Sequence, residues 1–137
     1  MNSVMLSRPR PTITTLSEPY WAGLRAQKLL IQRCTNCLLF RHYPRPMCGD
    51  CNSMQSDWME VSGSGLVYSW TVCYHPFHSG FSNEGPYTLL TVQLEEGPRM
   101  VAPLRHKVPL DIQLGIPVHV GFELIDEELT LPCFRPI

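Results

Sequence analysis

The sequence has no long apolar run and no basic N-terminal region followed by an apolar segment. A helix that crosses a membrane needs about 20 mostly apolar residues, whereas the purely apolar runs here extend over only a few. A secretory leader needs a basic start and an apolar stretch, and the first residues supply neither. We therefore expect no membrane span, no signal peptide and a cytoplasmic location.

The sequence also lacks a recognisable catalytic constellation. An enzyme would need a nucleophile beside a base, a pair of carboxylates, or a metal with an open coordination position. Glu127 and Glu128 lie in an acidic turn, where charge is usually solvated. His75 and His78 have a spacing that suits a metal, but no third ligand is visible beside them. We predict no catalytic residue and no enzymatic activity for this chain.

The formal net charge is only −1, but it is unevenly distributed. Residues 1–51 carry seven Lys and Arg against two Asp and Glu, whereas residues 52–137 carry four against ten. Tyr68, Trp70 and Tyr74 share one face of a predicted strand and resemble a platform on which bases stack. A surface that follows nucleic-acid phosphates needs cations, so the acidic second part favours a place for this stripe in the core or an interface.

Four of the six cysteines form two close pairs, C-x2-C-x10-C-x2-C, made by Cys34, Cys37, Cys48 and Cys51. Two residues between cysteines let a turn direct both sulfurs to one point, and the span 38–47 can leave and return as a hairpin. Two such turns make a tetrahedral four-thiolate site that suits one structural Zn²⁺. A closed shell of this kind leaves no position for water or substrate.

Other interpretations of the cysteines stay open at this point. Two disulfides, four unrelated thiols, or iron in a rubredoxin-like electron-transfer site would also fit the sequence. His42 lies inside the hairpin and could compete with a cysteine for the metal. The other two cysteines, Cys73 and Cys133, lie in strand-like stretches, and we interpret both as buried small apolar groups.

The first half of the chain divides into an arm, a helix and the ribbon. Residues 1–16 contain prolines and scattered hydroxyl residues without periodicity, which predicts an extended arm. A short helix is predicted to begin with Ser17 as N-cap, Glu18 in the first turn, and Pro19 where no N–H is needed. The helix and the zinc ribbon together are expected to occupy residues 17–62.

A two-residue period after position 62 predicts a second domain over residues 63–137. The stretches with strand-like composition or alternation are 65–74, 87–95, 99–104, 118–124 and 129–134. Five short antiparallel strands predict a small barrel, with the OB-fold as the leading candidate. The expected fold is mainly β, with a short N-terminal helix, a rubredoxin-like zinc ribbon and a C-terminal five-stranded OB-fold barrel.

The order of these segments resembles a known family. A tryptophan-bearing helix is followed by LLIQRCTNC, YPRPMCGDC, WMEVSGSGLVYSWTV, PYTLLTVQLEEGPRMVAPL, LGIPVHVGFE and LPCFRPI. Over residues 18–137 this order is similar to that of the acyl-CoA-associated zinc-ribbon plus OB-fold proteins, once catalogued as a domain of unknown function. Zinc ribbons occur in many unrelated proteins, so the specificity lies in their combination with the later segments.

The resemblance implies an accessory role. Members of this family accompany thiolase-like enzymes, which make or cleave carbon–carbon bonds, and some accompany enoyl-CoA hydratases. It also implies one structural Zn²⁺ on the four ribbon cysteines. The function we predict is a non-catalytic subunit of an acyl-CoA-processing complex. It would form a hetero-oligomer with such an enzyme, support that enzyme and help to bind its acyl-CoA. The alternative is a nucleic-acid-binding zinc-ribbon and OB-fold protein.

Five residues are candidates for contact with the partner or its substrate. Trp21 lies on the predicted helix, where the simpler expectation is packing against the ribbon or the barrel. Phe77 and Phe81 lie in a loop longer than a tight hairpin, which either covers the barrel mouth or reaches a partner. Arg41 and Arg45 can offset the charge of the zinc tetrathiolate or meet the phosphates of CoA.

Overall fold

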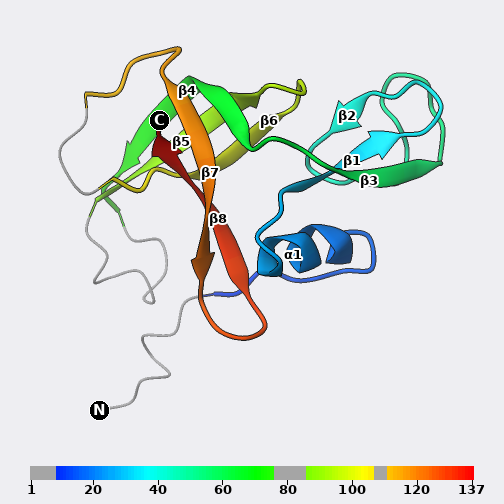
Figure 1. Cartoon of the computed structure of the whole chain (residues 1–137), viewed down its shortest axis with the longest axis horizontal. Helices are drawn as coiled ribbons and strands as arrows, with labels where there is room; N and C mark the ends of the chain where they lie inside the picture. Colours follow the sequence, from blue (N-terminus) through cyan, green and yellow to red (C-terminus); the bar gives the residue numbers. More distant parts are fainter. Residues whose placement is uncertain (1–8, 76–85, 107–110) are drawn as a thin grey trace.

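The structure is a computed structural model that describes residues 9–75, 86–106 and 111–137. These ranges contain one helix and eight strands, and the strands form two sheets. No helix in them is long and apolar enough to cross a bilayer. Figure 1 shows a small lobe built on β1–β3 and a larger lobe built on β4–β8, with α1 beside both. The loop residues Phe77 and Phe81 lie outside the described residues, as does His78.

Helix α1 (Glu18–Arg25) lies where the sequence predicts it, but Ser17 does not cap it. Ser17 has αR backbone angles, φ −92° and ψ −8°, and its side chain makes no cap hydrogen bond. Its Oγ instead accepts a hydrogen bond from the backbone N–H of Thr14 at 3.0 Å. The Glu18 N–H donates to the Thr14 carbonyl at 2.8 Å, so a preceding turn already supplies the acceptor that a cap would provide. Ser17 thus occupies the N-cap position as predicted, but the predicted cap by its hydroxyl was wrong.

The small lobe is a three-stranded antiparallel sheet in the order β2-β1-β3. β1 (Leu30–Cys34) is central and carries the first cysteine at its end, with β2 (Phe40–Arg41) on one side and β3 (Ser56–Glu60) on the other. β3 was not predicted from the sequence, because its residues are half-buried or exposed and lack an alternating apolar pattern. This strand closes the ribbon behind the second cysteine pair.

The large lobe contains the five predicted barrel strands. They are β4 (Ser64–Cys73), β5 (Tyr87–Leu94), β6 (Arg99–Pro103), β7 (Pro117–Leu124) and β8 (Thr130–Pro136). Neighbours pair antiparallel in the order β6-β5-β4-β7-β8. A parallel bridge between Leu104 and Phe134 brings the two edges together, so the sheet is a nearly closed barrel, as predicted.

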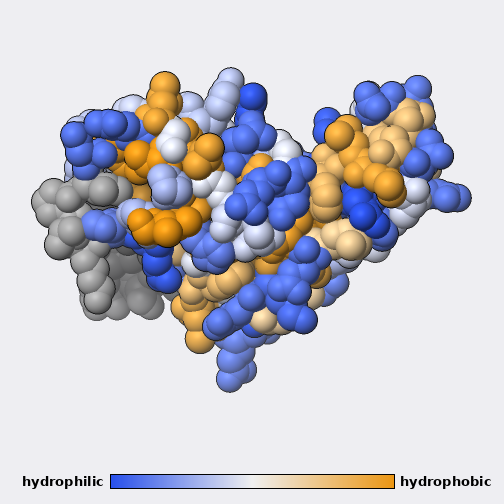
Figure 2. Space-filling model, turned by 45° about the horizontal axis from the view of Figure 1, so that its top comes forward, coloured by the Kyte–Doolittle hydropathy of each residue, from blue (hydrophilic) through white to orange (hydrophobic). Residues whose placement is uncertain are grey.

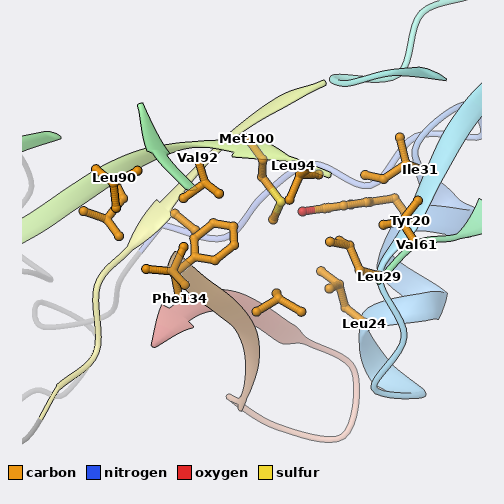
Figure 3. Close-up of a cluster of buried hydrophobic side chains, with 14 residues drawn as sticks. Tyr20, Leu24, Leu29, Ile31, Val61, Leu90, Val92, Leu94, Met100 and Phe134 are labelled. Carbon is orange, nitrogen blue, oxygen red and sulfur yellow. The ribbon is translucent and has the colours of Figure 1, made fainter. Parts of the chain in front are cut away.

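One hydrophobic cluster joins the two lobes. Leu24 from α1, Leu29 before β1 and Phe134 from β8 are each no more than 1% exposed. Figure 3 shows Tyr20 extending from the helix side of this cluster toward the barrel residue Leu94. Burial of each large apolar side chain contributes roughly 1.5–3 kcal/mol, so the shared core holds ribbon, helix and barrel together.

The aromatic stripe of β4 is not part of this core. Tyr68 and Trp70 are 50% and 40% exposed. A β-bulge shifts the register at Tyr68, whose ring lies 3.7 Å from the guanidinium carbon of Arg99 on the outer face. Trp70 instead pairs with Leu90, which is buried in the barrel. The bulge therefore places the two aromatic rings on opposite faces, and the prediction of a single stripe was wrong.

Candidate metal centre and contact surface

The four predicted cysteine ligands converge on one point. Their sulfur atoms all lie within 4.8 Å of one another. The Sγ atoms of Cys34 and Cys51 are 3.5 Å apart, and those of Cys37 and Cys48 are 3.6 Å apart. A tetrahedron with Zn–S bonds of about 2.3 Å has S–S edges of about 3.8 Å, whereas a disulfide requires about 2 Å. The arrangement fits a four-thiolate zinc site and not two disulfides.

Backbone N–H groups point at sulfur in both turns. The Cys37 N–H donates to Cys34 Sγ at 3.5 Å, and the Asp50 N–H donates to Cys48 Sγ at 3.4 Å. The Cys37 N–H makes the largest contribution to lowering the pKa of Cys34 to about 6, and the Cys51 N–H likewise lowers the pKa of Cys48. Since the thiolate is the form that binds a metal, these N–H groups favour cation binding at the first cysteine of each pair, whereas burial and the neighbouring cysteine side chains raise the pKa of Cys37.

The two turns repeat the same backbone geometry. Leu38 and Asn52 each follow the second cysteine of a pair and have φ angles of 66° and 63°. Each donates its N–H to the carbonyl of the first cysteine of its pair, at 3.0 Å. The left-handed conformation is uncommon for leucine, so its recurrence marks a specific turn. Such matched turns are typical of a zinc knuckle and not of unrelated cysteines.

His42 does not join the cysteines. Its ring lies beside those of Tyr20 and Tyr43, at centroid distances of 5.2 and 4.0 Å. Burial lowers the pKa of His42 to about 4, and neither ring nitrogen has a hydrogen-bond partner among the described residues. His42 is thus a neutral packing residue. The shell of four thiolates is complete without it and leaves no open position for chemistry.

A buried hydrogen-bond network fixes the hairpin between the cysteine pairs. Gln32 is 2% exposed, and its Oε1 accepts from Arg41 Nε at 2.9 Å and from the Arg45 backbone N–H at 2.8 Å. Its Nε2 donates to Ser56 Oγ at 3.0 Å. Arg41 is 4% exposed and donates through Nη2 to the Arg45 carbonyl at 2.8 Å. Arg41 therefore holds the hairpin from inside, while the Arg45 side chain is exposed.

A mostly apolar groove of about 510 Å³ lies where α1, the hairpin and the barrel meet. Trp21 lines it from the helix, Tyr43 from the hairpin and Val101 from β6. Tyr43 and Val101 are 55% and 42% exposed, although the sequence analysis singled out neither. Trp21, a predicted contact residue, therefore lies in an open apolar groove formed by α1, the hairpin and β6.

A second pocket of about 630 Å³ lies between the hairpin and the turn that joins β5 to β6. Its lining includes Arg41, Arg45 and Arg99, and Asp50 is its one carboxylate residue. Figure 2 shows apolar surface over each lobe with hydrophilic side chains between them. Arg99 was not predicted as a contact residue, because nothing in the local sequence indicates which strand end faces the ribbon.

Two family descriptions match the chain, one for each lobe. "ChsH2, rubredoxin-like zinc ribbon domain" matches residues 21–53, and "ChsH2, C-terminal OB-fold domain" matches residues 58–123. The matches agree with the four converging sulfurs and with the nearly closed barrel. The ribbon accordingly carries one structural zinc ion, and the barrel is an OB-fold.

Curated relatives include a scaffold protein and two hydratase subunits. A "DUF35 domain-containing scaffold protein" of Pyrococcus furiosus is 40% identical over 110 residues, which cover 79% of each protein. A "Probable enoyl-CoA hydratase alpha subunit" of Thermomonospora curvata is 42% identical over 94% of this chain and 40% of the relative. The "3-oxo-4,17-pregnadiene-20-carboxyl-CoA hydratase alpha subunit" of Mycobacterium tuberculosis is 33% identical over 82% and 35%. The chain thus spans well under half the length of the two hydratase relatives.

Solved structures agree with the architecture. One described as "Ltp2-ChsH2(DUF35) aldolase" has 40% sequence identity and a TM-score of 0.81, covering 93% of this chain and 98% of that chain. A DUF35-family protein of Sulfolobus solfataricus, at 14% identity and a TM-score of 0.63, covers 90% and 86% and supports the fold alone. With its rubredoxin-like zinc ribbon, its OB-fold and these relatives, the chain belongs to the DUF35 family of ChsH2-type proteins.

Proposed function

We propose that this chain is a non-catalytic accessory subunit of an acyl-CoA-processing complex. The observation that carries the proposal is the match to a chain of the solved structure described as "Ltp2-ChsH2(DUF35) aldolase", which extends over nearly the whole of both chains. The scaffold name of the Pyrococcus furiosus relative and the hydratase names of two others support the same role.

The chemistry of the site supports a role without catalysis. The zinc shell is closed by four thiolates, so the metal has no position for substrate. The Ser64 Oγ and the His119 Nδ1 are 2.9 Å apart, which resembles a nucleophile and its base. Both residues are exposed or half-exposed, and no carboxylate orients the imidazole among the described residues. This pair lacks the third group that an activated serine usually needs.

The partner we propose is a thiolase-like or hydratase-type enzyme, bound in a hetero-oligomer that also handles the acyl-CoA. Support comes from the names of the relatives, of which one is an aldolase and two are hydratase subunits. A cytoplasmic location is part of the proposal, because free cysteines that hold zinc suit a reducing compartment.

We also propose that the chain divides into three structural parts. The arm is proposed over residues 1–16, and among its described residues Arg10 forms an ion pair with Asp126, between β7 and β8, at 2.9 Å. Residues 17–62 form the helix and ribbon, and residues 63–137 form the barrel. The change of sheet between β3 and β4 supports this boundary.

The proposed contact residues differ in how they act. Trp21 and the Arg45 side chain contribute directly, since one lines the apolar groove and the other is exposed in the basic pocket. Arg41 contributes by holding the hairpin in place. Phe77 and Phe81 stay proposed contacts on the sequence argument alone.

Co-purification from the native host tests the proposal. The tagged chain is recovered intact, and retained proteins and nucleic acids are identified by mass spectrometry and by nuclease digestion. A retained thiolase-like, aldolase or hydratase enzyme is expected. Cys37→Ser should lose the partner with the zinc, whereas Cys73→Ser, which lies outside the ribbon, should keep both. Retained RNA without any enzyme would instead favour the nucleic-acid-binding alternative.

A further inference from the structure

The arginines without an ion pair gather at one place. Eight arginines lie in the described residues, and four of them form ion pairs with carboxylates: Arg10, Arg25, Arg33 and Arg105. Of the four that form no ion pair with a carboxylate of the described residues, Arg41, Arg45 and Arg99 all line the 630 Å³ pocket. Arg135 is the exception and lies elsewhere on β8. The pocket thus concentrates positive charge that the described part of the chain does not neutralise through salt bridges.

Arg41 is buried beneath this pocket and has only neutral partners. Its Nε and Nη2 donate to the Gln32 amide oxygen and the Arg45 carbonyl. Its Nη1 is buried and has no hydrogen-bond partner among the described residues. A buried charge without a counter-charge is costly, so this position favours a negative group nearby.

Arg99 is also held by neutral groups. Its Nε donates to Gln93 Oε1 at 3.0 Å, and its guanidinium lies over the ring of Tyr68. Gln93 in turn donates to the Gly97 carbonyl, which links the side chain to the turn between β5 and β6. A guanidinium fixed in this way keeps its full charge and loses little conformational freedom when it binds an anion.

Negative charge also lies near the pocket. Asp50 lines it, and so does Cys48, a ligand in a zinc tetrathiolate of formal charge about −2. The backbone N–H groups that donate to the sulfurs offset part of that charge within the ribbon. Arg45 and Arg99 are exposed and line the pocket, and neither forms an ion pair with a carboxylate of residues 9–75, 86–106 and 111–137.

We propose that this pocket binds a phosphate group, as a monoester or a diphosphate. One arginine fork already satisfies the two oxygens of a carboxylate, whereas a phosphate has at least three peripheral oxygens and carries close to two charges. It can therefore be bound by Arg45 and Arg99 together, with the charge of Arg41 beneath it. The proposal extends the contact predicted for Arg45, and it stands apart from the accessory role because it concerns the isolated chain.

Phosphate binding is tested on the full zinc-loaded chain. Inorganic phosphate and pyrophosphate are titrated by calorimetry and phosphorus NMR at constant ionic strength, and zinc content is measured afterwards. We expect saturable binding that Arg45→Gln and Arg99→Gln each weaken by about tenfold, the size of one charge-assisted hydrogen bond. Arg135→Gln is the matched control and should change the affinity less than about twofold.

Two results would overturn this inference. One is the absence of saturable binding by the wild-type chain, and the other is equal binding by the Arg45→Gln, Arg99→Gln double variant and the Arg135→Gln control. If the chain bound no phosphate but still retained a partner enzyme, only the phosphate site would be refuted and the accessory role would stand. Phosphate binding without any retained enzyme would remove the accessory role and leave the site in place.

Discussion

Replacing Gln32 by methionine should destabilise the ribbon without touching zinc, the groove or the pocket directly. Gln32 is 2% exposed and makes hydrogen bonds to Arg41, to the Arg45 backbone and to Ser56. It therefore connects all three parts of the ribbon: β1, the hairpin and β3. Methionine has a similar volume and no amide, so the substitution removes the hydrogen bonds and leaves little cavity.

The magnitude follows from the donors that lose their acceptor. The Arg45 backbone N–H loses its partner, whereas Arg41 Nε keeps a longer contact with the Arg45 carbonyl at 3.3 Å. A buried donor left unsatisfied costs about 1–3 kcal/mol. One donor that is fully unsatisfied and one that is partly satisfied give an expected loss of about 2–4 kcal/mol in the free energy of unfolding.

Urea denaturation followed by tryptophan fluorescence measures the effect, with zinc content checked for every sample. Gln55→Met is the matched control, because Gln55 lies in the same lobe with an exposed side chain, and it should stay within about 0.5 kcal/mol of wild type. A Gln32→Met variant as stable as Gln55→Met would refute the view that the network fixes the hairpin.

Three further predictions follow from particular residues. Leu24→Ala should lower the free energy of unfolding, measured by urea denaturation, by about 3 kcal/mol, because Leu24 is fully buried between the lobes. Ile13 is exposed, so a loss no greater than that of Ile13→Ala would contradict a shared core. Burial lowers the pKa of His42 to about 4, from 6.5 in the unfolded chain. As the pH falls, the unfolded state therefore takes up the proton first, and the protein loses stability between about pH 6.5 and about pH 4. This loss is on the order of 2 kcal/mol at pH 5, and an equally steep pH dependence in His42→Phe would contradict it. Cys37→Ser should abolish the bound zinc measured by atomic absorption and Cys73→Ser should retain it, whereas equal zinc contents would place the ligands elsewhere.

The barrel could be predicted closely because its strands alternate in a way that a half-buried sheet requires. β5, for example, begins at Tyr87 as expected, and its even-numbered residues from Leu90 to Leu94 are buried. Cys133 is likewise buried as predicted, while Cys73 is only half-buried because β4 ends there. The cysteine spacing predicted the metal cluster for a similar reason, since the chemistry of the site is local in sequence.

The features that could not be predicted depend on contacts between residues that are distant in the sequence. β3 has no apolar period, since it is defined by its pairing with β1. The bulge at Tyr68 reverses which face of the sheet the following side chains point to, and no local sequence pattern indicates it. Arg41 looked like a surface cation, but Gln32 holds it inside the ribbon. Arg99 reaches the same pocket only because the turn between β5 and β6 packs beside the hairpin.

The most direct test of the central claim, that zinc shapes a contact surface and performs no chemistry, is metal substitution in the complex recovered from the host. The ribbon is loaded with Zn²⁺ or Co²⁺, and both complex formation and the turnover of the partner enzyme are measured. A structural four-thiolate site predicts the same complex and turnover within about twofold for the two metals. Turnover that follows the identity of the metal, at unchanged complex formation, would contradict the claim.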